Sequence, residues 1–279
     1  MINDNDVMRE VLSRLPIKSL LSCKCVCKWW NFLISDPIFA WNYVNRNPHL
    51  FVSGFFLQKL LYLQLYPDLE FVTLDGTIDA APEASLSFIN DEKGVLIQHS
   101  CNGLLCCSSS RCHENDRVYY ICKPTTKQYT VLPRPMATTV FGINIAFDPS
   151  KTLDYKVVCI CDSELSSDHC QITVYDSRTI SWRLSGSPFL QVEGLLYGRG
   201  VFWNGSLHWI GVKETSLRFD AEQELLVEMP SPPLREGWEE RRLRYFGESR
   251  GHLHLIEIYG PRTTLFDVME LRKDYSGWS

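Results

Sequence analysis

The chain has 279 residues, of which 45% are hydrophobic and 22% charged, so it is long and apolar enough to bury one or two cores and is not disordered. Its net charge of −5 lacks the basic excess expected of a non-specific binder of nucleic acid or anionic membranes. Residues 1–6 do not resemble a signal peptide, and the apolar stretch 50–65 is too polar and too short to span a bilayer. We expect a soluble protein of the cytoplasm, the nucleus or both.

The eleven cysteines are an odd number, are scattered along the chain and follow no export signal. We therefore expect reduced thiols that act as small buried apolar groups on strands, rather than a disulfide framework. A structural zinc site is the less favoured alternative, because the cysteine spacings do not supply two ligand pairs. No metal or other cofactor is predicted.

The first 45 residues have a helical pattern. Apolar residues recur every three or four positions from Val7 to Leu15 and again over residues 17–27, and a short third run covers residues 29–34. Pro16 ends the first helix, and Asp36-Pro37 ends the third. Three short helices cannot hide all the large apolar side chains of this segment, so some of them must face a partner or the following domain.

From about residue 50 the helical pattern gives way to short alternating runs, which predict antiparallel strands. The clearest runs are 118–122, 143–147, 156–161, 171–175 and 253–258. Turn residues recur about every 45 to 55 residues in two interleaved series, which is typical of four-stranded propeller blades. The first series is Asn102-Gly103, Asp148-Pro149, Asn204-Gly205 and Arg250-Gly251, and the second lies near Thr126, Arg178 and Glu222. A β-sandwich with coincidental spacing is the alternative.

The sequence does not indicate a catalytic site. The G-x-S-x-G match at residues 247–251 precedes an alternating run, whereas a nucleophile elbow requires a helix there. His252 and His254 project from one face of that run, but no third metal ligand is evident, so a surface pair is the preferred interpretation. We therefore expect no catalytic and no metal-binding residues.

The amino-terminal segment closely resembles an F-box. The resemblance rests on VLSRLPIKSLL at residues 11–21, CVCKWW at 25–30 and LISDPIF at 33–39. It implies a three-helix module that docks on the Skp-type adaptor of cullin-based SCF ubiquitin ligases. Many F-boxes open with Leu-Pro and an acidic residue, whereas this chain reads Asp4-Asn5-Asp6, so we expect reduced adaptor affinity or docking through the remaining hydrophobic face.

The rest of the chain resembles the kelch-related F-box-associated domain of a large plant family. The matching segments are SCNGLLC at 100–106, AFDP at 146–149, DYKVV at 154–158 and VFWNGSLHW at 201–209. The expected fold is mainly β within the α+β class: a three-helix F-box at 1–45, a linker and first strands at 46–95, and an all-β, propeller-like domain at 96–279. Family members usually continue further, and residues 50–279 hold about five blades, so we expect a ring short of its closing strands, as in a truncated product.

The resemblance implies a non-catalytic substrate receptor of an SCF-type ubiquitin ligase. The helical module would bind the adaptor and, through it, the cullin and RING subunits, while the β domain binds an unidentified target protein. Carried over residue by residue, the adaptor contacts fall on Leu15, Pro16, Leu20, Leu21, Val26, Cys27, Trp30, Leu33 and Ile34. Two alternatives stay open: a propeller enzyme acting on glycans or small molecules, and a binding module without ligase attachment.

Overall fold

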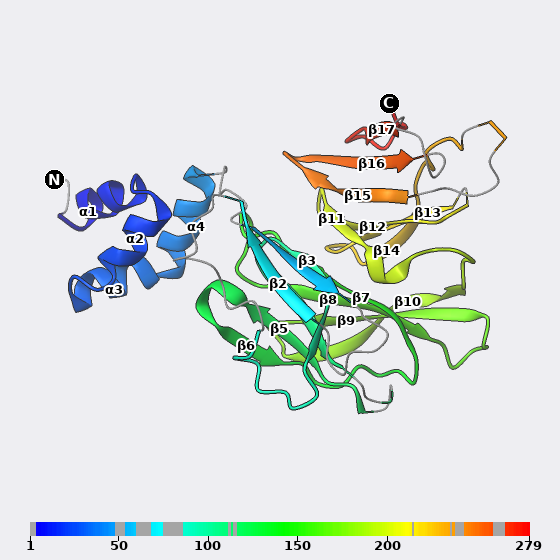
Figure 1. Ribbon diagram of the computed structural model, residues 1–279, viewed down its shortest axis with the longest axis horizontal. Coiled ribbons are helices and arrows are strands. Elements are labelled where there is room, and N and C mark those ends of the chain that lie inside the picture. The colour runs from blue at the N-terminus through cyan, green and yellow to red at the C-terminus, as the bar shows by residue number, and fades with distance from the viewer. Residues whose placement is uncertain are drawn as a thin grey trace. The chain divides into compact units, whose positions relative to one another are not determined.

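The structure is a computed structural model that describes residues 4–47, 54–59, 68–74, 86–110, 113, 116–213, 215–234, 236–237, 243–258 and 266–279. The chain divides into two compact units, Met1–Ser53 with Asp148–Asp154, and Gly54–Phe147 with Tyr155–Ser279. Figure 1 shows the helices of the first unit and the strands of the second. Residues 4–47 are called the helical unit below, and the second compact unit is called the β unit.

Four helices form the helical unit: α1 (Asp4–Ser13), α2 (Ile17–Cys23), α3 (Lys28–Ser35) and α4 (Pro37–Arg46). The three predicted helices are present, but α2 ends at Cys23 and is followed by a turn up to Cys27. Cys27 has an extended backbone and its Sγ accepts the backbone N–H of Trp30 at 3.4 Å. Cys27 therefore caps the start of α3.

A fourth helix, α4, follows the three that the sequence predicts. Asp36 follows α3, and its Oδ1 accepts the backbone N–H of Ile38 at 3.0 Å while its carbonyl accepts that of Ala40 at 2.9 Å. Pro37 suits the first position of a helix, where its missing N–H is no loss. The Asp36-Pro37 pair therefore ends one helix and begins the next.

All four helices contribute to one small core. Its buried side chains are Leu12 from α1, Leu20 from α2, Leu33 and Ile34 from α3, and Phe39 and Tyr43 from α4. The hydroxyl of Tyr43 donates to the carbonyl of Leu15 at 2.8 Å, which joins α4 to the residues that connect α1 and α2. The helical unit thus has an apolar interior of its own.

The β unit contains five antiparallel sheets among the described residues. A two-stranded sheet comprises β1 (Gly54–Lys59) and β2 (Asp68–Thr73). Three sheets have four strands in chain order: β3 (Val95–Cys101), β4 (Leu104–Ser109), β5 (Tyr119–Lys123) and β6 (Gln128–Val131); β7 (Val140–Ala146), β8 (Lys156–Asp162), β9 (His169–Asp176) and β10 (Ser181–Leu190); and β11 (Val201–Trp203), β12 (Ser206–Ile210), β13 (Ser216–Asp220) and β14 (Leu225–Glu228). The fifth has β15 (Leu243–Ser249), β16 (His252–Ile258) and β17 (Phe266–Leu271).

The predicted runs coincide with β5, β7, β8, β9 and β16. Asn102-Gly103, Asn204-Gly205 and Arg250-Gly251 each join the first two strands of a sheet, and both residues of each pair have positive φ. This is the geometry of the type I′ turn, which matches the twist of the flanking strands. Asp148-Pro149 is the exception, because the carbonyl of Asp148 accepts the N–H groups of Lys151 and Thr152 instead.

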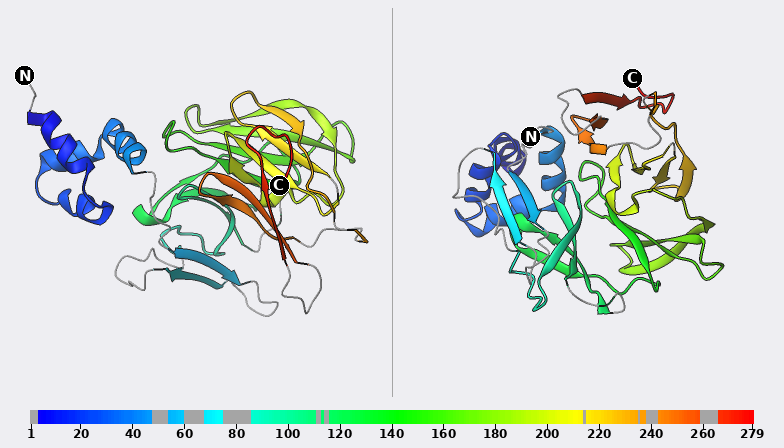
Figure 2. Two further views of the ribbon diagram at one scale, coloured as in Figure 1. Left: turned by 90° about the horizontal axis from the view of Figure 1, so that it is seen from above. Right: turned by 45° about the vertical axis from the view of Figure 1, so that its right-hand side comes forward.

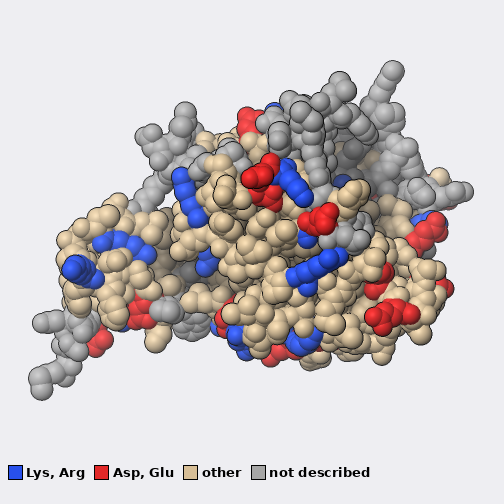
Figure 3. Space-filling view, turned by 90° about the horizontal axis from the view of Figure 1, so that it is seen from below, with Lys and Arg blue, Asp and Glu red and all other residues tan. Residues whose placement is uncertain are grey.

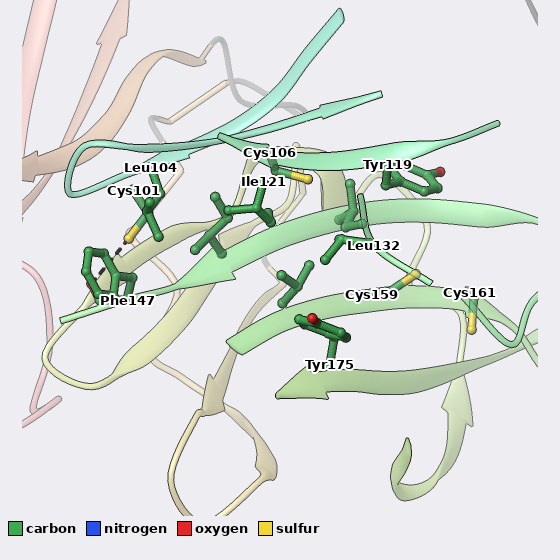
Figure 4. Close-up of a cluster of buried hydrophobic side chains, with 13 residues drawn as sticks. Cys101, Leu104, Cys106, Tyr119, Ile121, Leu132, Phe147, Cys159, Cys161 and Tyr175 are labelled. Carbon is green, nitrogen blue, oxygen red and sulfur yellow. Dashed lines mark hydrogen bonds between the residues drawn. The ribbon is translucent and has the colours of Figure 1, made fainter. Parts of the chain in front are cut away.

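Successive sheets are arranged as propeller blades. Their first strands contact one another, β3 with β7, β7 with β11 and β11 with β15, and Figure 2 shows the sheets in colour order from cyan to red. Cys106, Ile121 and Tyr175 belong to the apolar layer between the first two four-stranded sheets (Figure 4). A sandwich would divide the strands between two facing sheets, so that alternative is wrong. The described strands do not close into a ring.

Buried polar side chains join three of these first strands. His99 of β3 accepts the N–H of Ile145 on Nδ1 at 3.1 Å, and its Nε2 lies 2.7 Å from the carbonyl oxygen of Gly200, just before β11. Asn144 of β7 accepts the N–H of Gly200 at 3.0 Å and donates to the carbonyl of Tyr197 at 2.9 Å. Burial lowers the pKa of His99 to about 4, so this bridge carries no charge at neutral pH.

Indole N–H groups make further ties between neighbouring blades. The acceptors are backbone carbonyls at 2.7–2.9 Å: Pro133 for Trp182, Gly251 for Trp203 and Pro230 for Trp278. The indole ring fills apolar space, and its single N–H points in one fixed direction. Each of these tryptophans therefore also sets the distance between the two sheets that it joins. The β unit is therefore held by directional bonds as well as by its core.

The contrast between Gly200 and Gly198 tests the polar bridge. A Cβ at Gly200 would lie 2.6 Å from Asn144 Oδ1 and 2.7 Å from Trp209 Nε1, whereas a Cβ at Gly198 would meet nothing within 4 Å. We expect Gly200→Ala to lower the free energy of unfolding by about 1–3 kcal/mol, because groups fixed by hydrogen bonds must move. Urea unfolding should show little change for Gly198→Ala. Equal effects of the two substitutions would contradict the prediction.

Candidate functional site

Large apolar side chains remain exposed on the helical unit although it has a core. The exposed fraction is 51% for Leu21, 62% for Val26 and 74% for Phe32. Among the side chains of this unit that the structure describes, the exposed large apolar ones, called the apolar surface below, are Val7, Val11, Ile17, Leu21, Val26, Trp29, Phe32 and Ile38. Uncharged residues make up most of the visible surface of this unit in Figure 3. Exposed apolar groups at this density are typical of a surface that another polypeptide covers.

Helical spacing explains why these side chains point outward. Ile17 and Leu21 are four residues apart on α2 and share one face, while the neighbouring Leu20 enters the core. Trp29 and Phe32 lie three residues apart on α3, and both are exposed. Both helices therefore carry two apolar stripes, one for the interior of the unit and one directed away from it.

The nine residues predicted to contact an adaptor fall into three groups. Pro16, Leu21, Val26 and Cys27 are exposed, and Leu15 and Trp30 are half-buried against the core. The other three, Leu20, Leu33 and Ile34, are covered by the unit's own helices, each 5% exposed or less. Those three can act on a partner only by supporting the helices that carry the apolar surface.

The sequence reasoning missed several of the most exposed apolar residues: Val7, Val11, Ile17, Trp29, Phe32 and Ile38. The available signal was the helical period, since Trp29 and Phe32 lie three residues apart on α3 and the buried Ile34 lies on the opposite side of that helix. Which of two apolar stripes faces inward depends on how α2 and α4 pack against α3, and the period alone does not give that.

Charged groups fasten α1 to α4. Glu10 of α1 binds Arg14, just past the end of that helix, at 2.6 Å and Arg46 of α4 at 2.5 and 2.7 Å, and Arg9 binds Asp36 at 2.6 Å. Hydrogen bonds from Arg46 and Arg14 lower the pKa of Glu10 to about 2. The helices that carry the apolar surface are thus joined by charge-assisted hydrogen bonds between carboxylate and guanidinium groups.

The β unit adds no metal centre to this description: among the described residues, no group of three or more His, Cys, Asp or Glu side chains is arranged to hold a metal ion. His252 Nδ1 lies 2.5 Å from Glu270 Oε1, and His254 Nε2 lies 3.9 Å from Glu270 Oε2, so both rings face one carboxylate on β17. The β-unit cysteines of known placement are buried, as predicted: Cys101, Cys106, Cys107, Cys122, Cys159, Cys161 and Cys170. No helix within the described ranges is long and apolar enough to cross a membrane.

The carboxylate of Glu10 makes the helical unit sensitive to acid. Its pKa in the folded chain lies below the usual value of 4.5, so its stabilisation is complete above about pH 4.5 and is lost as the pH falls toward 2. We expect amide protection of residues 4–47, corrected for intrinsic exchange, to fall over that window. Glu10→Gln should reduce protection at pH 6 and weaken its pH dependence.

Hydrogen-exchange mass spectrometry of the full chain measures both effects. Glu92→Gln, at an exposed carboxylate of the β unit, is the matched control and should leave residues 4–47 unchanged. A Glu10→Gln variant with the pH profile of the unsubstituted chain would show that the two arginines do not hold α1 against α4.

Comparison with known families identifies both parts of the chain. Residues 5–47 match the model described as F-box-like, and residues 68–234 match the F-box associated beta propeller domain. The second match covers more than half of the chain.

Several Arabidopsis thaliana proteins are similar along most of the chain. F-box protein At5g07610 is 33% identical over 299 aligned positions, covering 99% of this chain and 68% of the relative. F-box protein At5g49610 is 29% identical, covering 91% and 71%, and F-box/kelch-repeat protein At3g23880 is 25% identical, covering 81% and 65%. The chain thus spans about two thirds of each relative. It belongs to the plant F-box proteins that carry a carboxy-terminal F-box-associated domain.

Proposed function

We propose that the chain is a substrate-recognition subunit of an SCF-type ubiquitin ligase, with the helical unit binding a Skp-type adaptor and the β unit binding a target protein. The observation that carries the proposal is the apolar surface, which stays exposed although the helical unit has its own core. Membership of the F-box family supports a Skp-type adaptor as the partner of this surface. Attachment to the cullin and RING subunits would follow through the adaptor.

Desolvation supplies the affinity in this proposal. Leu21 and Val26 are aliphatic groups that can enter a groove between helices, and Trp29 and Phe32 offer the large aromatic area that often dominates binding energy. Trp30 packs against the core of the helical unit, so we assign the role of aromatic anchor to Trp29 and Phe32. Because hydrogen bonds of Glu10 and Tyr43 already fix the helices, binding would cost little further conformational entropy.

The altered start of the F-box bears on affinity. Asp6 belongs to the first turn of α1, where a carboxylate is favoured by the positive end of the helix dipole. We propose that Asp6 stabilises α1 in place of the usual Leu-Pro contact, and that the adaptor is held mainly through the apolar surface.

The β unit would act without a catalytic group of its own. A target held on the blades brings one of its lysines close to a ubiquitin thioester carried by another subunit, so the rate rises through effective concentration. A rigid binder serves this purpose, and the bridge through His99 and Asn144 provides such rigidity across three blades. No cofactor is required, and the site of action would be the cytoplasm, the nucleus or both.

Substitution of exposed residues tests adaptor binding without disturbing the core. We expect the double variant Leu21→Asp with Val26→Asp to lose at least about tenfold in adaptor affinity, since two charges would enter an apolar contact. Pull-down with purified Skp-type adaptor, followed by titration calorimetry, measures the loss. Leu20→Asp is unsuitable, because Leu20 is 3% exposed and its substitution would unfold the unit.

Leu225→Asp is the control, because Leu225 is 54% exposed but lies on β14 of the β unit. It should bind the adaptor as well as the unsubstituted chain does. Full adaptor binding by the Leu21/Val26 double variant would contradict the proposed surface. Failure of the unsubstituted chain to bind any Skp-type adaptor would favour a binding module without ligase attachment.

A further inference from the structure

A cleft of about 520 Å³ opens at one end of the sheet β7–β10. Because the strands alternate in direction, the start of β7, the β8–β9 connection and the end of β10 meet at that end, as the pairs Val140 with Cys161 and Leu190 with His169 show. The chain then lines the cleft again on its way to β11, through residues 191–197. The volume is within the range of about 300–1,000 Å³ that is typical of ligand sites.

The floor of the cleft is apolar. Leu195 and Tyr197 are buried in the core between the second and third four-stranded sheets, and Phe141 and Val192 pack on the same core while keeping part of their surface accessible. Leu165 on the β8–β9 connection and Leu190 at the end of β10 lie at this end of the sheet and are 66% and 62% exposed. An incoming apolar side chain would therefore find a preformed surface that is only partly covered.

The rim of the cleft is acidic. Asp168 and Glu193 line it, with side chains 67% and 87% exposed. The sequence from Asp162 to Asp168 adds Glu164 and contains no Lys or Arg. Nearby positive charge comes from Lys213, which pairs with Glu193 at 3.1 Å, and His169 contacts Asp168 at 2.7 Å. Both side chains of the Lys213–Glu193 pair are exposed, so that pair is weak, and Asp168 is itself largely exposed; both carboxylates can therefore accept a second cation.

The loop that carries Glu193 is fixed in place. The N–H of Gln191 donates to the carbonyl of Asp168 at 2.8 Å, and that of Val192 to the hydroxyl of Tyr197 at 3.1 Å. Gly194 has φ +77°, and a Cβ there would lie 2.6 Å from Val212 Cγ2. The cleft is thus preorganised, and binding would cost little loop ordering.

We propose that this cleft binds an extended segment of the target protein in which an Arg or Lys side chain precedes a large apolar one. The cationic group would lie between Asp168 and Glu193, and the apolar side chain would cover Phe141 and Val192. Charge complementarity selects this occupant over an acidic segment, which both carboxylates would repel. That the segment belongs to a ubiquitination target rests on the proposed function, whereas the preference for a basic segment does not.

Peptide binding to the full chain tests the proposal. The probes are two mixtures of fluorescently labelled short peptides with random flanks, one with Arg-Leu fixed at the centre and the other with Glu-Leu. We expect fluorescence anisotropy to show about three- to tenfold tighter binding of the Arg-Leu mixture, decreasing with added NaCl. Asp168→Asn with Glu193→Gln should abolish the difference between the mixtures.

The matched control is Glu92→Gln, which removes an exposed carboxylate of the β unit that does not line the cleft. It should retain the preference for Arg-Leu. Equal binding of the two mixtures by the unsubstituted chain, or an unchanged preference in the double variant, would overturn the proposal. Adaptor binding is measured on the same preparations: its loss with a retained Arg-Leu preference would refute the ligase role and leave the cleft assignment standing.

Discussion

Short helices can enclose only one apolar face each, and this limit governs the amino-terminal part of the molecule. The four helices have ten residues or fewer, and a single stripe from each fills the core around Leu12, Leu33 and Phe39. Among the side chains that the structure describes, the further large apolar ones are only partly buried or stay exposed. The exposure of Phe32 and Val26 is therefore a direct result of the composition of this segment, and association with a partner is the way to remove that surface from water.

The β unit has a different requirement. Its sheets contact one another through their first strands, so many strands must be held in a defined arrangement. Apolar layers between blades provide most of the burial, but they have little directionality. His99, Asn144 and the indoles of Trp182 and Trp278 add bonds with fixed geometry between successive sheets. A surface formed by several strand connections, such as the cleft beside Gln191, keeps its shape because these bonds fix the blades beneath it.

Local patterns predicted the β unit well and the apolar surface of the helical unit less well. Alternation at 171–175 and the Asn204-Gly205 turn depend on neighbouring residues only, so β9 and the β11–β12 hairpin could be located from the sequence. The pair Asp36-Pro37 has two compatible roles, and only the packing of α4 shows that it also begins a helix. Leu20 and Leu21 are chemically identical, and the packing of α2 decides which of them a partner can reach.

The placement of the thiols has a consequence for reagents that modify cysteine. Burial raises the pKa of Cys170 to about 11 and raises that of Cys106 further, so neither forms the reactive thiolate at neutral pH. Cys25 and Cys27, in contrast, are exposed beside Val26. Among the described cysteines, a maleimide dye would therefore react with those next to the apolar surface rather than with the buried ones of the blades, which provides a fluorescent reporter where the adaptor is proposed to dock.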